Sequence, residues 1–231
     1  MNDVEVHFPF RPYDVQRDYM KAVLTALQNS QHALLESPTG TGKTLCLLCS
    51  ALAWQRQEKG RLAQRTQQPP APANGRDDND APPPPPSKPP VIIYASRTHS
   101  QLSQVVGELR NTRYRPRHAV LGSREHSCIH PKVNPALARA GNGGPSSSDA
   151  DRSRSSSEVN DGCGKLAKGR KCSFRNNLEE KAGKGSGGGV GCWRPPVERA
   201  AAGGDYEQPV LDMEDLVALG RKHRVCPFYH T

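Results

Sequence analysis

The segment 34–48, which reads LLESPTGTGKTLCLL, restricts the fold of this chain more than any other feature. An apolar run at 32–37 leads into a glycine-rich turn, and an apolar stretch at 44–54 follows the turn directly. This order of strand, turn and buried helix is the setting that a phosphate-binding loop requires. The segment therefore predicts an α/β domain that binds a nucleoside triphosphate.

Hydrophobic periodicity predicts the other elements of that domain. Apolar side chains recur at helical spacing over 13–28, which predicts a helix there. Another helix is expected to begin with Ser100 as its cap, and a short one is expected over 212–219. Continuous β-branched or apolar runs predict two further strands, at 91–96 and 118–123. Because strands alternate with helices, we expect the strands to form a parallel sheet.

Three segments have a composition that does not suit a packed core. Residues 59–90 are proline-rich and favour extended polyproline II, whereas 141–162 and 182–208 are rich in Gly and Ser. Only 34% of the chain is hydrophobic and 5% is aromatic, so apolar burial cannot offset the ordering entropy of every residue. We expect all three segments to be disordered insertions at the surface.

Each residue type in the phosphate loop, residues 37–44, has a chemical reason to be there. Gly40 and Gly42 allow positive φ angles, which turn backbone N–H groups toward phosphate oxygens. Lys43 reaches the β and γ phosphates and the Thr44 hydroxyl binds Mg²⁺, so these two are the catalytic candidates. The residues expected to bind the nucleotide are Ser37, Pro38, Thr39, Gly40, Thr41, Gly42, Lys43 and Thr44. Ser37 replaces the first glycine of the general pattern, and a glycine-rich turn without function is the alternative.

Gln16 lies upstream of the first predicted strand. A side-chain amide pairs a donor with an acceptor, and this pair can read the edge of adenine, which would favour ATP over GTP. A polar residue on a helix surface explains Gln16 equally well.

The charge of the chain indicates the kind of partner. Lys plus Arg outnumber Asp plus Glu by 32 to 23, and the formal net charge of +9 suits nucleic acid, although solvated basic linkers give the same balance. No run approaches the ~18 apolar residues that a membrane span needs. The start, MNDVEVHFPF, has no signal pattern. We therefore expect a soluble intracellular protein with no membrane partner.

The seven cysteines fall into three groups. Cys46 and Cys49 lie in the apolar helix after the loop and are expected to pack in the core. Cys192, in a Gly-rich insertion, is interpreted as a spare thiol. The other four have basic neighbours, which favour thiolates, and lack the close C-x2-C pairs of zinc ribbons. An iron–sulfur cluster, a zinc ion and an unliganded set remain open for Cys128, Cys163, Cys172 and Cys226.

Five strings resemble one known family. They read SPTGTGKTLCLLCSALAW, VIIYASRTHSQLSQVVGELRNTRYRP, LGSREHSCIHP, CSFRNNLEEK and VLDMEDLVALGRKHRVCPFYHT. They are similar to the iron–sulfur superfamily 2 DNA helicases of the xeroderma pigmentosum group D-like family, and the last string favours the branch that acts on telomeres. The resemblance implies an α/β fold: a partial RecA-like P-loop motor domain with a parallel sheet, interrupted by an iron–sulfur cluster domain and the disordered insertions.

The resemblance also implies domain boundaries. Residues 1–58 would be the first part of the RecA-like ATP-binding domain, and 91–123 would continue it after the proline-rich insertion at 59–90. Residues 124–231 would form the iron–sulfur domain, which contains the two Gly/Ser-rich insertions.

Two helicase motifs follow from the same resemblance. Residues 37–44 would be motif I, with Gln16 in the adenine-sensing segment. Residues 95–101, ASRTHSQ, would be motif Ia, whose donors touch the phosphates of single-stranded DNA. Its DNA-binding residues would be Ser96, Arg97, Thr98, His99 and Gln101, and an ordinary polar turn is the alternative.

The resemblance implies that the four cysteines hold a 4Fe–4S cluster in a small domain that helps to split the duplex. Basic residues beside the cysteines would contact DNA phosphate, and solvated loop charge explains each of them equally well: Lys165, Lys168, Arg170 and Lys171. The chain departs from the family at Arg175, where an aromatic residue is usual.

The implied activity is ATP-dependent 5′-to-3′ unwinding of DNA in the nucleus, in telomere maintenance, DNA repair and recombination control. The cofactors would be ATP, Mg²⁺ and the cluster, and the partner would be single-stranded and branched or looped duplex DNA, with replication or telomere proteins as compatible partners.

The sequence shows no acidic Walker B strand and no second motor domain. We therefore expect an N-terminal part of such a helicase, which binds ATP without hydrolysing it efficiently. A non-catalytic module that binds nucleic acid and metal is the alternative, and a different P-loop enzyme, such as a small kinase, is a third reading.

Overall fold

The computed structural model describes residues 1–67, 88–139, 154–182 and 210–230. Most residues of the three predicted insertions, namely 68–87, 141–153 and 183–208, lie outside these ranges. The chain divides into two units, Met1–Pro116 and Arg117–Thr231. Each unit is helical and buries its own set of apolar side chains. Within the described ranges, no helix is both long enough and apolar enough to cross a membrane.

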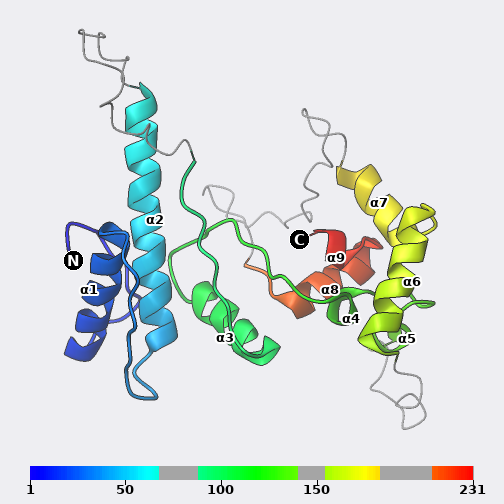
Figure 1. Ribbon diagram of the computed structural model, residues 1–231, viewed down its shortest axis with the longest axis horizontal. Coiled ribbons are helices and arrows are strands. Elements are labelled where there is room, and N and C mark those ends of the chain that lie inside the picture. The colour runs from blue at the N-terminus through cyan, green and yellow to red at the C-terminus, as the bar shows by residue number, and fades with distance from the viewer. Residues whose placement is uncertain (68–87, 140–153, 183–209, 231) are drawn as a thin grey trace, which may run out of the picture. The chain divides into compact units, whose positions relative to one another are not determined.

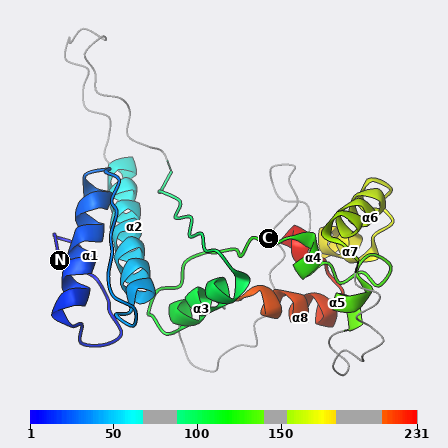
Figure 2. The same ribbon diagram turned by 60° about the horizontal axis from the view of Figure 1, so that its bottom comes forward.

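The first unit is built on two helices that lie side by side, as Figures 1 and 2 both show. Its described helices are α1 (Asp14–Gln28), α2 (Lys43–Gln67) and α3 (His99–Arg110). α1 buries Met20 and Leu24 one turn apart, and α2 buries Cys46 and Cys49. These positions confirm the helix predicted over 13–28 and the interpretation of both thiols as core residues. α3 packs on α2.

Two helix ends differ from the predictions. α2 continues to Gln67, so residues 59–67 are helical and are not part of a proline-rich insertion. The first proline after the helix starts is Pro69, and until that point no residue interrupts the backbone hydrogen bonds. α3 is capped by Thr98, whose hydroxyl accepts a hydrogen bond from the backbone N–H of Gln101. The predicted cap, Ser100, is therefore already inside the helix.

The predicted parallel sheet is not observed in the described part of the chain. Residues 32–37, 91–96 and 118–123 have no strand structure there. A parallel strand exists only when a neighbouring strand supplies its hydrogen bonds, and none of these three segments is paired with another. Their apolar side chains are consequently exposed, with Leu34 and Ile93 as the clearest examples.

The second unit consists of short helices around two small apolar clusters. Its described helices are α4 (Arg124–Ser127), α5 (Pro135–Arg139), α6 (Ser156–Lys168), α7 (Ser173–Ala182), α8 (Met213–His223) and α9 (Pro227–His230). One cluster comprises Cys128, Val133, Val159 and Cys163, with Leu166 packed against it. The other comprises Leu178, Val225 and Cys226, with Phe174 and Phe228 packed against it. α8 confirms the helix predicted over 212–219, with Asp212 as its cap.

The predicted insertion at 141–162 is wrong at its C-terminal end, because α6 starts within it. The Ser155 hydroxyl accepts a hydrogen bond from the backbone N–H of Glu158 at 3.3 Å, and the Glu158 carboxylate accepts one from the backbone N–H of Ser155 at 2.8 Å. This reciprocal pair is a capping box. The helix then buries Val159 and Cys163, which lie four residues apart on one face.

Candidate nucleotide loop and cysteine site

The phosphate loop leads directly into the N-terminus of α2. Gly40 has a φ of +85° and Gly42 a φ of +72°, which other residues rarely adopt. A Cβ on Gly42 would also lie 3.0 Å from Nε2 of Gln16. The turn therefore requires both glycines, and it brings the loop to the positive end of a long helix.

Lys43, the first residue of α2, folds its side chain back onto the loop. Its Nζ donates hydrogen bonds to the backbone oxygens of Ser37 at 2.8 Å and Pro38 at 2.7 Å. The ammonium group is thus held by the carbonyls of the loop itself. A bound phosphate would compete with these two oxygens for the ammonium, and a charged acceptor makes the stronger hydrogen bond. Thr44 is the next residue of α2 and is half-buried.

A chain of hydroxyl groups crosses the loop. The oxygens of Ser37 and Thr41 lie 2.6 Å apart, and the Thr41 hydroxyl donates to the backbone oxygen of Pro38 at 2.9 Å. Since a hydroxyl has a single proton, Ser37 must be the donor to Thr41. Ser37, which replaces the usual glycine, therefore braces the loop from one side to the other. Thr39 and Gly40, at the tip of the turn, are exposed.

Gln16 connects α1 to the phosphate loop. Its Nε2 donates to the backbone oxygen of Thr41 at 3.1 Å, and its Oε1 accepts from the backbone N–H of Tyr13 at 3.0 Å. An amide has two donor and two acceptor positions, so these bonds use one of each. The second donor and acceptor positions have the chemistry that an adenine edge needs. Adenine recognition by Gln16 stays a prediction.

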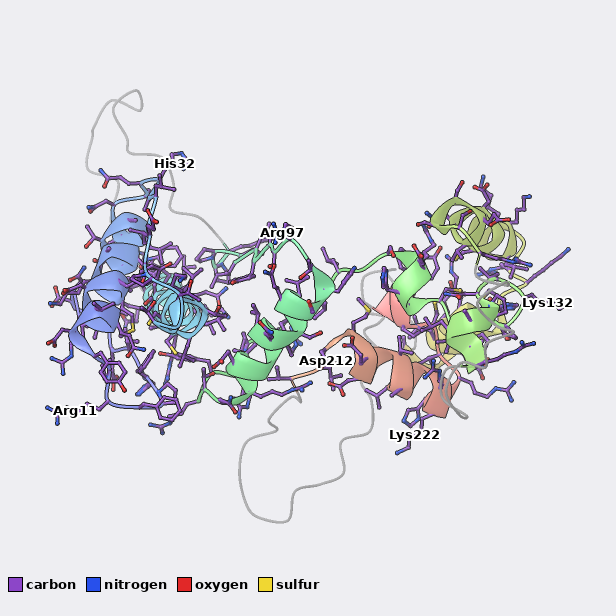
Figure 3. All side chains as sticks on the ribbon, turned by 90° about the horizontal axis from the view of Figure 1, so that it is seen from below. Arg11, His32, Arg97, Lys132, Asp212 and Lys222 are labelled. Atoms are coloured by element: carbon purple, nitrogen blue, oxygen red, sulfur yellow. The ribbon has the colours of Figure 1, made fainter. Side chains whose placement is uncertain are left out.

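The expected DNA-binding residues lie together on the turn that starts α3. The Ser96 hydroxyl donates to Oε1 of Gln101 at 2.7 Å, and the Thr98 cap holds the backbone of Gln101. Arg97 lies in the segment just before α3 (Figure 3). All five predicted side chains are exposed, including that of His99. Their contact with DNA stays a prediction.

The four cysteines lie on four different parts of the second unit. Cys128 follows α4, Cys163 lies in α6, Cys172 precedes α7, and Cys226 lies between α8 and α9. Cys172 is half-buried and the other three are buried. Since α5, α6 and the predicted insertions separate them in sequence, folding rather than local spacing brings them into one region.

The thiols of this region lie in one another's electrostatic field. Burial raises the pKa of Cys128 to about 11, and negative charge on Cys163 or Cys172 would raise it further. Burial raises the pKa of Cys226 to about 12, with charge on Cys172 and Cys128 acting in the same direction. Burial therefore opposes thiolate formation at these two residues in the metal-free protein, and at Cys128 it outweighs the nearby Arg124 guanidinium.

A single metal ion does not fit the arrangement of these side chains. Thiolates bound at ~2.3 Å to one tetrahedral zinc ion lie about 3.8 Å apart. In the described residues, no group of three or more His, Cys, Asp or Glu side chains is arranged to hold a metal ion. Four thiols are also the donor set of a 4Fe–4S cluster, and that cluster stays a prediction.

Arg124 is a site residue that the sequence reasoning missed. Its guanidinium lies over the ring of Phe228, 4.3 Å from the centroid. The pKa of Arg124 is raised, first by its hydrogen bond to the Tyr229 hydroxyl and further by the nearby Cys163 thiol. The signal was present in the sequence, because Arg124 lies four residues before Cys128.

The basic residues that follow Cys163 are exposed on the last turn of α6 and the turn after it. These residues are Lys165, Lys168, Arg170 and Lys171. Elsewhere in the same unit, the side chains of Lys132 and Lys222 also project into solvent (Figure 3). These exposed cations lie on the same unit as the four cysteines and suit a polyanionic partner.

Comparison with known proteins identifies related sequences. The DEAD_2 family model matches residues 94–231, and therefore covers the whole cysteine region. The chain is 42% identical to "Regulator of telomere elongation helicase 1" of Rattus norvegicus and 41% identical to the Homo sapiens protein of that name, in each case over 99% of this chain. It is 40% identical to the "Regulator of telomere elongation helicase 1 homolog" of Oryza sativa subsp. japonica over 98% of this chain. The matched region spans 16% to 20% of these three relatives.

Proposed function

The chain belongs to the DEAD_2 family, and on that basis we propose that it provides the ATP-binding and cluster-binding part of a DNA helicase. The proposed activity is ATP-dependent 5′-to-3′ unwinding of branched or looped duplex DNA in the nucleus, with single-stranded DNA as a further binding partner. The names of the relatives support a role in telomere maintenance. Roles in DNA repair and recombination control belong to the same proposal.

The phosphate loop is the observation that carries this proposal. Two glycines with positive φ, a lysine at the first position of a 25-residue helix, and a threonine beside it form one continuous turn. On nucleotide binding, Lys43 would exchange the carbonyls of Ser37 and Pro38 for phosphate oxygens. Thr44 would offer its hydroxyl to Mg²⁺. Gln16 would hold the loop to α1 and present its remaining donor and acceptor to the base.

The cysteine region is assigned to a 4Fe–4S cluster in this proposal. Cys128, Cys163, Cys172 and Cys226 would hold it, and when bound it would supply a covalent link between four segments of the unit. The thiols must lose their protons for this to happen, and the raised pKa values of Cys128 and Cys226 oppose that loss in the metal-free protein. The guanidinium of Arg124, next to Cys163, supplies a compensating positive charge.

The experiment that tests the proposal is equilibrium binding of ATP with Mg²⁺ to the 231-residue chain. Lys43→Ala should weaken ATP binding at least tenfold, because it removes a charge-assisted contact to phosphate. Lys59→Ala, on an exposed position of the same helix, is the matched control and should leave the affinity unchanged. Equal affinities of wild type and Lys43→Ala would overturn the proposal. The experiment measures ATP binding by the 231-residue chain and does not measure ATP hydrolysis.

A non-catalytic module that binds nucleic acid and metal is the second candidate. The observation that favours it is that the Lys43 ammonium already donates hydrogen bonds to two backbone carbonyls of the loop. A loop with a purely structural role would lose stability in Lys43→Ala and would show no ATP affinity in the wild type. The same titration therefore separates the two candidates.

A further inference from the structure

Arg175 lies in the first part of α7 and reaches across to α9. Its guanidinium carbon lies over the Tyr229 ring, 4.5 Å from the ring centroid. Its Nε donates to the Glu179 carboxylate at 3.0 Å, one turn further along α7. The guanidinium is therefore fixed on one edge by a carboxylate and on one face by an aromatic ring, which is the arrangement of a cation–π pair.

α7 also makes three hydrogen bonds to the segment that carries Cys226. The backbone N–H of Cys226 donates to the backbone oxygen of Phe174 at 3.0 Å. The side chain of Asn177 donates to the backbone oxygen of Arg224 at 2.9 Å, and Nζ of Lys181 donates to that of His223 at 2.7 Å. These contacts follow one another along the helix and along residues 223–226. They satisfy backbone groups that the end of α8 leaves open.

Apolar packing closes the space between the two segments. Leu178 of α7 is 3% exposed and forms a cluster with Val225 and Cys226. Phe174 and Phe228 pack against that cluster. The contacts of α7 therefore surround Cys226 with backbone hydrogen bonds, a buried leucine and, through Arg175, a stacked tyrosine three residues after the cysteine.

Cys172 belongs to the same rigid arrangement. It immediately precedes α7, and its backbone oxygen accepts the hydrogen bond from the backbone N–H of Asn176 that opens the helix. The other two cysteines, Cys128 and Cys163, share a different apolar cluster. Two thiols of the proposed set are thus positioned by one helix, through contacts between protein groups.

We propose that α7 holds Cys172 and Cys226 as a preformed pair in the metal-free protein, and that Arg175 is the positioning residue that locks this pair through Tyr229. The identity of the group that the pair binds rests on the proposed function, in which the four cysteines hold a cluster. The pairing itself depends on protein contacts alone. Iron would then arrive at a site of which one half is already in place, so that Arg175 would affect how long iron is retained more than how much is bound.

The test is amide hydrogen exchange of the metal-free full chain, followed by release of iron from the reconstituted protein to a chelator. Arg175→Ala should speed exchange of the amides of residues 224–226 and 228 by about two- to fivefold, the change expected from loss of one cation–π pair. Iron release should accelerate by a similar factor, with the iron content at saturation unchanged.

Arg170→Ala is the matched control. Arg170 also contacts the Glu179 carboxylate, at 3.8 Å, and its side chain is 85% exposed. Its removal should change neither rate. Arg175→Lys retains the positive charge and loses the planar stack, so it should lie between wild type and Arg175→Ala. It also keeps the test decisive if the alanine variant fails to fold.

Wild-type exchange at residues 224–226 and 228 in both Arg175 variants would overturn the inference. So would equal acceleration in Arg170→Ala, because the effect would then come from charge near Glu179. A wild-type chain that takes up no iron would overturn the proposed cluster, and the exchange measurement would still decide whether α7 positions the pair.

Discussion

The side-chain amide of Gln16 donates a hydrogen bond to the backbone oxygen of Thr41 at 3.1 Å, which ties the first helix to the phosphate loop. Thr41 lies between the two glycines with positive φ, at the part of the loop that depends most on its neighbours. Gln16 therefore has a structural effect on the loop whether or not it also contacts a base.

Gln16→Glu should weaken ATP binding by about two- to tenfold. The carboxylate can still accept from Tyr13, but it cannot donate to Thr41, and a hydrogen bond of this kind contributes about 0.5–1.5 kcal/mol. Gln28→Glu is the matched control, because Gln28 makes a similar bond to the backbone oxygen of Asn2 at the other end of α1. Titration with ATP would contradict the account if both substitutions had the same effect.

The hydroxyl chain from Ser37 through Thr41 to Pro38 should support nucleotide binding. Thr41→Val keeps the shape of the side chain and removes both hydroxyl bonds, so ATP affinity should fall by about tenfold. Thr41→Ser keeps the hydroxyl and should bind ATP nearly as wild type does. If the serine variant were as weak as the valine variant, packing of the methyl group would be responsible.

Gly220 should tolerate no side chain. A Cβ there would lie 2.5 Å from Cγ of Pro227 and 3.0 Å from the backbone oxygen of Val225, next to Cys226. Gly220→Ala should lower the free energy of unfolding by about 1–3 kcal/mol, measured by denaturant titration.

Gly107→Ala is the control for Gly220→Ala. A Cβ at Gly107, inside α3, would meet nothing within 4 Å. Its free energy of unfolding should rise by about 0.5–1 kcal/mol, because alanine favours a helix. Equal effects of the two substitutions would show that the contact with Pro227 is unimportant.

Alkaline pH should destabilise the first unit through Cys49. Burial raises the pKa of this thiol from 9.0 to about 12. Its contribution to stability is complete below pH 9 and is lost as the pH rises toward 12, because the unfolded thiol ionises first. The loss is at most about 1.4 kcal/mol per pH unit. Cys49→Val should show a shallower decline than wild type between pH 9 and 11, and identical slopes would contradict the assignment.

The sequence predicts the helices of the first unit better than its strands. The period of the apolar residues in α1 is a local property, and it locates the helix to within one residue. A strand depends on partners far away in sequence, so the apolar residues at 91–96 could indicate a strand without establishing that it is paired. Leu34 and Ile93 are exposed for that reason.

Only some features of the cysteine region could be predicted from the spacing of residues in the sequence. The four thiols chosen from the sequence do share one region. The raised pKa values of Cys128 and Cys226 depend on burial, and the role of Arg124 depends on its contacts with Tyr229 and Cys163; no local pattern reports either. The start of α6 had a local signal, the capping box of Ser155 and Glu158, which the serine-rich composition concealed. Arg175 stands at a position where an aromatic residue is usual in the resembled family. Its guanidinium stacks on the aromatic ring of Tyr229.

The most direct test of the whole account is the iron and zinc content of the anaerobically purified chain, measured together with its visible absorbance spectrum. Cys163→Ser removes one proposed ligand, and Cys192→Ser is the control at a cysteine outside the proposed set. We expect a brown wild-type protein with about four irons per chain, little or none in Cys163→Ser, and wild-type content in Cys192→Ser. A colourless protein with one zinc, or with no metal, would contradict the central claim that these four cysteines hold an iron–sulfur cluster.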